Sequence, residues 1–276
     1  MDIDIYKYLR EKQLPHIWCP GCGHGTILGN LIRGIDRAGY DQDKTVVVSG
    51  IGCSGRASGY LNFDTLHVTH GRAIPFATGI KLANPELNVI VITGDGDGAA
   101  IGGNHLIHGC RRNIEMTVIL FNNQIYGMTG GQFSPMTPMG DKGTTVPYGN
   151  IDQNFNLVEM TKSAGATFIA RTTTYHVNQL LRILTRGLKH KGFTFIETIS
   201  QCPINYGKRN GMKSVEEMLK WQKESAVDIK KWERLSPEDR EGKFPTGVLY
   251  HENRSEYTRL YDKVIEKAQK ECEANV

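Results

Sequence analysis

The sequence lacks the features of a membrane or secreted protein. Its 276 residues contain no run of about 18 uncharged apolar residues. The start, Met1-Asp2-Ile3-Asp4, lacks the basic-then-apolar order of a secretion signal. We therefore expect a cytoplasmic protein without membrane contact. The excess of positive charge is also small and dispersed, 33 Lys and Arg against 29 Asp and Glu, which disfavours nucleic-acid partners.

Two familiar cofactor motifs are missing as well. The segment Gly94–Gly98 does not match the G-x-G-x-x-G pattern of dinucleotide-binding folds, so a nicotinamide-dependent dehydrogenase is disfavoured. No dense C-x-x-C-x-x-C run of the ferredoxin kind is present, so clusters of that type would have to lie on another chain.

Hydrophobic patterning predicts an α/β fold. Five short apolar runs read as buried strands, and they are Thr45–Ser49, Asn88–Thr93, Glu115–Phe121, Thr167–Ala170 and Phe193–Ser200. Segments long enough for helices separate them, which predicts a doubly wound, mostly parallel sheet. Apolar residues at helical spacing between Ile27 and Ile35 predict a helix that ends at Gly39.

The chain divides into one large domain and a charged tail. We expect the domain over residues 1–206 and the tail over residues 207–276, where lysine and glutamate become frequent. Helices are expected at Ser214–Ser225 and Ser255–Glu273, and the tail would pack over the domain or a partner. The glycine- and proline-rich segment Tyr126–Tyr148 is predicted to be a long functional loop.

Unusual residues follow the strands directly. Ser49 leads into Cys53, Thr93 into Asp95, Phe121 into Asn122-Asn123, and Ser200 into Cys202. In an open parallel sheet, ligands bind at the carboxyl ends of the strands. The candidate chemistry is therefore predicted to gather at one edge of the sheet.

The first candidate is a diphosphate and magnesium site. Gly94 and Gly96 let the chain turn sharply around Asp95 and expose backbone amides at the start of an expected helix, Ala99–Arg111. The Asp95 carboxylate, the Asn123 amide oxygen and the Ile125 carbonyl would supply oxygen ligands of the kind magnesium prefers. A Gly-Asp-Gly triplet alone is also compatible with a simple glycine turn.

The second candidate is a four-thiolate site. Cys19 and Cys22 form a C-x-x-C pair, and Cys53 and Cys202 follow separate strands. Four thiolates can hold a cubane iron–sulfur cluster or a tetrahedral zinc ion, and the spacing leaves both open. Cys110, inside an expected helix, and Cys272, in the tail, are not assigned to the site.

These motifs resemble a known family. Gly94-Asp95-Gly96 followed by Asn122-Asn123 resembles the signature of thiamine diphosphate enzymes. The strings Gly94–Asn104, Thr69–Ala73 and Gln124–Gln132 resemble the β subunit of 2-oxoacid:ferredoxin oxidoreductases, nearest to the 2-oxoglutarate type. With the cysteines included, the likeness runs from about Tyr8 to Asn205.

The resemblance implies specific roles. Asp95, Asn123 and the Ile125 carbonyl would hold Mg²⁺, and Cys19, Cys22, Cys53 and Cys202 would hold a 4Fe-4S cluster. The residues that would line thiamine diphosphate are Ile51, Gly52, Cys53, Ser54, His70, Gly94, Gly96, Asp97, Gly127 and Met128. No residue of this chain is assigned a catalytic role, because the glutamate that activates the cofactor comes from an α subunit in this family.

The resemblance also implies the reaction. A 2-oxo acid, 2-oxoglutarate in the first instance, would lose carbon dioxide or be formed by the reverse carboxylation. Coenzyme A would take the acyl group and ferredoxin the electrons. Pyruvate or a branched-chain 2-oxo acid is the alternative substrate. Gly130 stands where many relatives carry a lysine linked to coenzyme A binding.

Two rival hypotheses come from other classes of protein. One is a thiamine diphosphate enzyme without redox function, in which the cysteines bind structural zinc. The other is a zinc-stapled interaction module whose Gly-Asp-Gly loop is only a turn. Bound acid-labile sulfide would exclude both.

Overall fold

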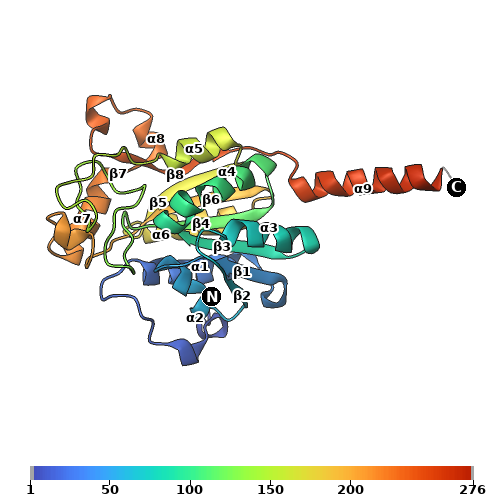
Figure 1. Cartoon of the computed structure of the whole chain (residues 1–276), viewed down its shortest axis with the longest axis horizontal. Coiled ribbons are helices and arrows are strands. Elements are labelled where there is room, and N and C mark those ends of the chain that lie inside the picture. The colour runs from blue at the N-terminus through green and yellow to red at the C-terminus, as the bar shows by residue number, and fades with distance from the viewer. Residues whose placement is uncertain (1–2, 275–276) are drawn as a thin grey trace.

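The computed structural model describes residues 3–274 and is built on one eight-stranded sheet (Figure 1). The strands are β1 (Thr45–Ser49), β2 (Asp64–His67), β3 (Asn88–Gly94), β4 (Met116–Asn122), β5 (Phe168–Thr173), β6 (Phe193–Ile199), β7 (Ala226–Asp228) and β8 (Phe244–His251). Their order across the sheet is β2-β1-β3-β4-β6-β5-β8-β7. Every neighbouring pair is parallel except β5 and β8.

Helices cover both faces of the sheet, which explains why the central strands β3 and β4 are buried along nearly their whole length. The main helices are α1 (His24–Ala38), α2 (Ala57–Tyr60), α3 (Ala73–Ala83), α4 (Gly103–Arg112), α5 (Leu157–Ala164) and α6 (Val177–Leu188). Helices α1, α2 and α6 contribute to one hydrophobic core, and α3, α4 and α5 to the other. The expected doubly wound α/β fold is therefore confirmed.

Helix α1 shows how the sequence pattern becomes packing. Ile27, Leu31 and Ile35 lie on one face of the helix and are fully buried. The helix ends where predicted, because Gly39 adopts a left-handed conformation with φ of 75° and its N–H bonds back to the last turn.

The C-terminal residues were expected to form a tail of helices, but they also contribute two strands to the sheet. Helices α7 (Val215–Ser225) and α9 (Tyr257–Glu273) lie close to the predicted bounds, and α8 (Ile229–Trp232) is short. The sequence indicated no strand here, yet β7 and β8 extend the sheet. Strand β2, half-exposed at the other edge of the sheet, was also not predicted. The division at residue 206 stays a prediction.

The prediction of a helix over Ala99–Arg111 is wrong about where the helix begins. Asp95–Ile101 forms a wider π-helical turn, and α4 begins only at Gly103. A π-helical turn widens the backbone and is frequent at functional sites. The predicted loop Tyr126–Tyr148 contains no regular helix or strand.

Helix α9 leaves the body of the molecule (Figure 1). Tyr257 packs against the second core, whereas Leu260, Tyr261 and Val264 are about half exposed. Neither α9 nor any other helix in residues 3–274 combines the length and apolar character that a membrane span requires.

Candidate functional site

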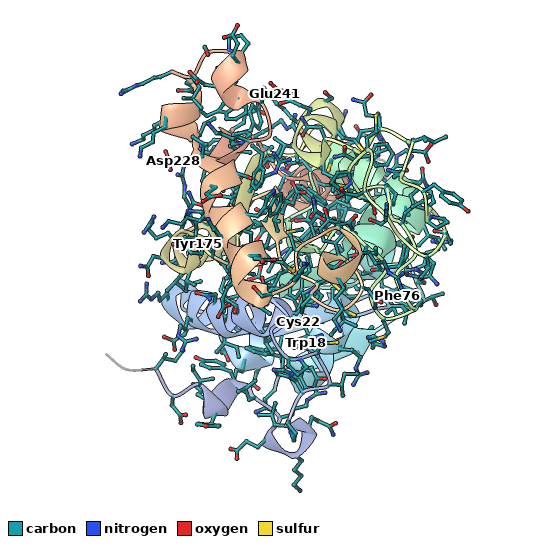
Figure 2. All side chains as sticks on the ribbon, turned by 90° about the vertical axis from the view of Figure 1, so that its left-hand side faces the viewer. Trp18, Cys22, Phe76, Tyr175, Asp228 and Glu241 are labelled. Atoms are coloured by element: carbon teal, nitrogen blue, oxygen red, sulfur yellow. The ribbon has the colours of Figure 1, made fainter. Side chains whose placement is uncertain are left out.

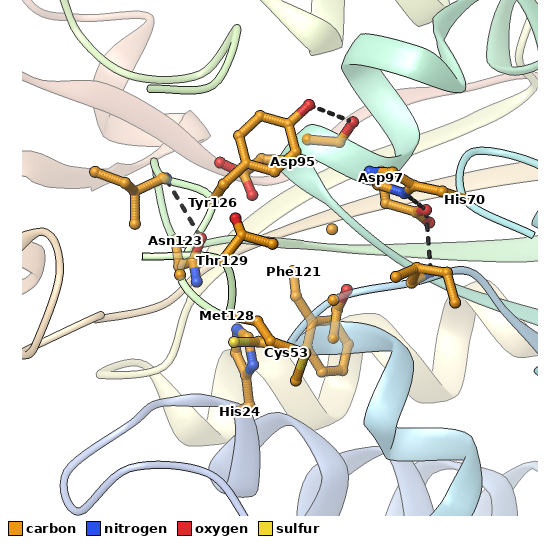
Figure 3. Close-up of a pocket in the computed structure, with 17 residues that line it drawn as sticks. His24, Cys53, His70, Asp95, Asp97, Phe121, Asn123, Tyr126, Met128 and Thr129 are labelled. Carbon is orange, nitrogen blue, oxygen red and sulfur yellow. Dashed lines mark hydrogen bonds and ion pairs between the residues drawn. The ribbon is translucent and has the colours of Figure 1, made fainter. Parts of the chain in front are cut away.

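A pocket opens at the carboxyl ends of β1, β3 and β4 (Figure 3). All ten residues predicted to line a cofactor lie around it, together with Asp95, Asn123 and Ile125. His24, Phe121, Tyr126 and Thr129 complete the lining. Its volume is about 100 Å³. Parallel strands have brought segments that are far apart in the sequence to one edge, as expected.

Asp95 is one of two buried carboxylates in the pocket wall. It follows β3 and is only 4% exposed. The Ser134 hydroxyl donates to its Oδ2 over 2.5 Å. Burial raises the pKa of Asp95 to about 7, although the hydrogen bonds from Ser134 and from backbone groups act in the opposite direction. A carboxylate held in this way is stabilised by a cation.

Asn123 and Ile125 place two further polar groups beside Asp95. Asn122 accepts a hydrogen bond from the Gln124 N–H, and Gln124 has a φ of 64°, so the chain turns back after β4. One terminal atom of the Asn123 amide lies 2.6 Å from the Ile125 carbonyl oxygen and 3.2 Å from Asp95 Oδ1. If this atom is the amide nitrogen, it donates a hydrogen bond to both oxygens. If it is the amide oxygen, it forms a group of three oxygens together with the Ile125 carbonyl and the Asp95 carboxylate. That donor set fits magnesium.

Asp97 connects three segments of the pocket wall. It accepts hydrogen bonds from Thr93, from the backbone N–H groups of Ile51 and Gly71, and it contacts His70 Nδ1 at 2.5 Å. Its oxygens are therefore occupied by the protein. Asp97 and His70 line the pocket as predicted, and the contacts of Asp97 favour a role in holding its wall together.

Two glycines permit close approaches in this wall. A side chain at Gly96 would collide with the Tyr126 ring, and one at Gly50 would collide with the Asp97 carboxylate. Tyr126 also donates to the Gly96 carbonyl over 3.2 Å. The loop after β4 thus packs directly on the π-helical turn. Glycine is required at these two positions for close packing. Gly94 has a φ of −103° and Gly96 is not among the glycines with positive φ, so the turn around Asp95 does not need the left-handed conformation of glycine.

The four predicted cysteines come together next to this pocket. Cys53 lines it, and the Sγ atoms of Cys53 and Cys202 both lie near Gly127. Burial raises the pKa of Cys22 to about 12, and the nearby thiols of Cys202, Cys53 and Cys19 contribute to the rise. Cys110 and Cys272 are free thiols outside this group, as expected.

Backbone groups hydrogen-bond three of these sulfurs. His24 does so for Cys22, Met128 for Cys53, and Asn205 with Tyr206 for Cys202, and each contact lowers the pKa of its thiol against the larger effect of burial. Hydrogen bonds to sulfur stabilise thiolates and tune bound clusters. Backbone groups of three loops are therefore directed at these sulfurs.

Gln201 ties two cysteine loops together. Its side-chain amide donates a hydrogen bond to the Gly21 backbone carbonyl over 3.0 Å. The backbone carbonyl of Gln201 accepts a hydrogen bond from the Gly23 N–H. The Gln201 side chain also accepts from Thr174 and from Gln222 of α7. Val215, at the start of α7, fills the space beside Gly21, and Figure 2 shows this helix running from near Cys22 toward Asp228.

The sequence reasoning missed several pocket residues. His24 is fully buried between Trp18 and Phe121, both of its ring nitrogens lack a partner, and burial lowers its pKa to about 4. Ser134 contacts Asp95 from the long loop. The only sequence signal for His24 was its position in the glycine-rich loop that contains Cys19 and Cys22. No feature of the sequence distinguished Ser134 from the other residues of its loop.

Known proteins resemble this chain over most of its length. Residues 50–198 match the family model for the thiamine pyrophosphate enzyme, C-terminal TPP-binding domain. The 2-oxoglutarate synthase subunit KorB of Methanothermobacter marburgensis is 52% identical over 96% of this chain and 93% of its own. The subunit of the same name from Methanocaldococcus jannaschii is 49% identical over 96% and 98%.

A solved structure resembles the fold. It is described as 2-oxoglutarate:ferredoxin oxidoreductase from Magnetococcus marinus with 2-oxoglutarate, coenzyme A and succinyl-CoA bound. The match has a TM-score of 0.86 and 33% identity, and covers 97% of this chain and 91% of that one.

Proposed function

The chain belongs to the family of β subunits of 2-oxoacid:ferredoxin oxidoreductases, as a 2-oxoglutarate synthase subunit, and from that membership we propose how its pocket works. The reaction is the oxidation of 2-oxoglutarate to succinyl-CoA and carbon dioxide with ferredoxin, or its reverse. We propose that Mg²⁺ anchors thiamine diphosphate at Asp95, and that the four cysteines hold a 4Fe-4S cluster beside it. The observation that carries this proposal is the position of Cys53, which belongs to both groups.

The magnesium proposal is supported by the oxygen donors on the wall. Asp95, Asn123 and the Ile125 carbonyl converge within hydrogen-bond distance of one another. Thiamine diphosphate, when bound, supplies the carbanion chemistry that releases carbon dioxide from a 2-oxo acid. In this scheme Asp95 and Asn123 fix the diphosphate end. Ile51 and Met128, which line the same pocket, exclude water from the reacting end.

The cluster proposal is supported by the gathering of four thiols beside the pocket. Cys19, Cys53 and Cys202 lie near enough to Cys22 to raise the pKa of its thiol, and Cys53 also lines the pocket. Four cysteine thiolates are the ligand set of a 4Fe-4S cluster. The cluster, when bound, carries single electrons.

A second subunit is needed to complete the pocket. Its volume of about 100 Å³ is below the roughly 300–1,000 Å³ that enclose whole ligands of cofactor size. Among the described residues, no glutamate lines it. Two of the side chains that line it, Ile51 and Met128, are apolar and exposed. We propose that the α subunit docks on this face and supplies the activating glutamate.

Gly130 stands where many relatives carry a lysine linked to coenzyme A binding, and the backbone conformation at Gly130 does not suit a lysine. Gly130 has a φ of 113°, a region that disfavours side chains, so lysine there would be strained. We propose that Arg209, which lies beside Gly131, or a basic residue of the α subunit meets the phosphates of coenzyme A instead.

The test is to purify the chain anaerobically with its α subunit. We expect about four irons and four sulfides per β chain, a visible spectrum that bleaches with dithionite, and 2-oxoglutarate-dependent reduction of ferredoxin that requires coenzyme A. Pyruvate should be a poor substrate. A colourless complex that contains zinc, or one that turns over without reducing an electron acceptor, would contradict the proposal. A cytoplasmic location stays a prediction.

A further inference from the structure

A second, larger pocket lies at the opposite edge of the sheet. Its volume is about 580 Å³, and the end of α6, the start of β5, the end of β8 and the start of α9 form it. It is lined by Phe168, Arg186, Lys189, His190, Lys191, His251, Asn253, Arg254, Ser255 and Arg259. Seven-residue strands at about 3.3 Å per residue separate the two edges by roughly 20 Å. This pocket is therefore distinct from the cofactor site.

The lining is strongly basic. Five lysines and arginines contribute to it, and no Asp or Glu does. An adjoining hollow shares Arg186 and Lys189 and adds Arg37 and Arg182, again without a carboxylate. The whole chain has a formal net charge of only +4. Positive charge is thus concentrated along one continuous depression.

Contacts within the chain neutralise only part of this charge. Arg254 lies 4.0 Å from the Glu252 carboxylate, and the Arg186 guanidinium lies over the Phe168 ring. Lys191 pairs with Glu115 at 2.7 Å, but the described residues offer no carboxylate within ion-pair distance of Arg186, Lys189 or Arg259. The end of α6 favours positive charge at Arg186 and Lys189. The first turn of α9 disfavours it at Arg259, yet Arg259 faces the same pocket. An external anion would stabilise all three.

His190 reports on the positive potential inside the pocket. Thr167 gives its proton to Asn113 over 2.8 Å, so His190 Nε2 donates to Thr167. The pKa of His190 is lowered to about 4, mainly by burial and also by the nearby His251 and Arg186, against the effect of Glu115. The ring of His190 lies 5.3 Å from that of His251.

We propose that this basic pocket binds a small anion that carries two or more phosphate groups. The lysines and arginines come from two regions, the end of α6 with the loop after it and the start of α9 with the loop before it. They face one concave space, so several phosphates can be bound at once, and arginine can grip each with two parallel hydrogen bonds. The volume lies in the range of small-molecule sites. Inorganic pyrophosphate and a nucleoside diphosphate share this chemistry.

The test is calorimetric titration of the complete αβ complex. The complex is first loaded with thiamine diphosphate and Mg²⁺ and freed of excess, so that the carboxyl-edge pocket is filled. Pyrophosphate and ADP are then titrated separately at about 0.15 M salt. We expect both to bind, and binding to weaken as salt rises, because the cations are exposed. Tighter binding of ADP would identify a nucleotide as the ligand, and equal binding an inorganic anion.

Matched variants locate the binding. Arg186→Gln/Lys189→Gln/Arg259→Gln should weaken binding at least about tenfold, since each lost charged hydrogen bond is worth about that factor. Lys220→Gln/Lys223→Gln/Lys230→Gln removes the same charge from exposed positions of α7 and α8 and should leave binding within about twofold. Both variants should oxidise 2-oxoglutarate normally without added anion. Absence of binding, or unchanged binding in the first variant, would overturn the proposal.

Discussion

The two edges of the sheet hold their charged groups in opposite ways. At the carboxyl edge, Asp95 and Asp97 are 4% and 3% exposed, and neighbouring groups hydrogen-bond both. At the opposite edge, Arg186, Lys189 and Arg259 are exposed and have no ion-pair partner among the described residues. The first arrangement fixes geometry before a ligand arrives; the second attracts by charge. Substitutions should therefore have large, specific effects at the carboxyl edge and small, salt-dependent effects at the other.

The largest effects are expected from two crossed substitutions. Cys202→Ser should abolish ferredoxin reduction and lower the iron content, while magnesium-dependent binding of thiamine diphosphate is retained. Asp95→Asn should lower activity at least about a hundredfold by removing a charged magnesium ligand, while iron and sulfide are retained. Iron analysis and cofactor titration measure the two losses. Cys272→Ser, at an exposed remote thiol, is the matched control. If either variant lost both the iron and the binding of thiamine diphosphate, the protein would be misfolded, and the idea of two separable sites would be contradicted.

Gly96→Ala should weaken thiamine diphosphate binding about tenfold or more. Its added methyl group collides with the Tyr126 ring, so the π-helical turn and the loop after β4 must separate. Titration of the cofactor in the presence of Mg²⁺ measures the effect. Gly79→Ala, in open space on α3, should instead stabilise the protein by about 0.4–1 kcal/mol. Equal cofactor affinity in the two variants would show that the close approach is unimportant.

Glu197→Gln should reduce the free energy of unfolding by about 3 kcal/mol. Glu197 is buried below the site, accepts from Arg171 over 2.7 Å and from Asn122 over 2.7 Å, and its loss leaves the Arg171 charge unpaired. Urea unfolding monitored by circular dichroism measures it. Glu224→Gln breaks only the exposed pair with Lys220 and should cost less than about 0.5 kcal/mol. If the two variants lost similar amounts of unfolding free energy, the predicted difference between the buried and the exposed ion pair would be refuted.

The smallest effect is expected at the basic edge, in His190→Asn. The pKa of His190 is about 4 in the folded protein against an ordinary value of 6.5. Between these pH values the unfolded chain binds more protons than the folded one, so stability should fall as pH falls from 6.5 toward 4. The variant should show a shallower decline of melting temperature over this range. An unchanged decline would mean that other groups determine it.

The sequence was sufficient to predict the carboxyl edge because each part carries its own local signal. Apolar runs marked β1, β3, β4, β5 and β6, and the glycines, asparagines and cysteines that follow them stood out by residue type. Topology then required these positions to meet. All ten predicted lining residues do line the pocket, while their individual roles stay predictions.

The parts that were missed depend on tertiary contacts. β8 pairs antiparallel with β5, and the register shifts between Ile169 and Ala170 of β5, where Leu249 of β8 has no opposite residue, so the β8 sequence lacks a clean strand pattern. Ser134 contacts Asp95 only because the loop after β4 folds back on the π-helical turn. The basic pocket combines two regions that are distant in sequence, residues 168–191 and 251–259, so its charges looked dispersed when read along the chain.

The contacts of Gln201 have a consequence for when the protein becomes functional in the cell. Gln201 joins the loop of Cys19 and Cys22 to Cys202, and Gln222 and Val215 of α7 secure that junction. These residues lie in the final third of the chain and leave the ribosome long after the first cysteine pair. A growing chain therefore presents only unfinished thiol loops. On the proposed cluster assignment, iron and sulfide would be bound only after α7 has emerged, and truncated chains that end before α7 should not hold the cluster.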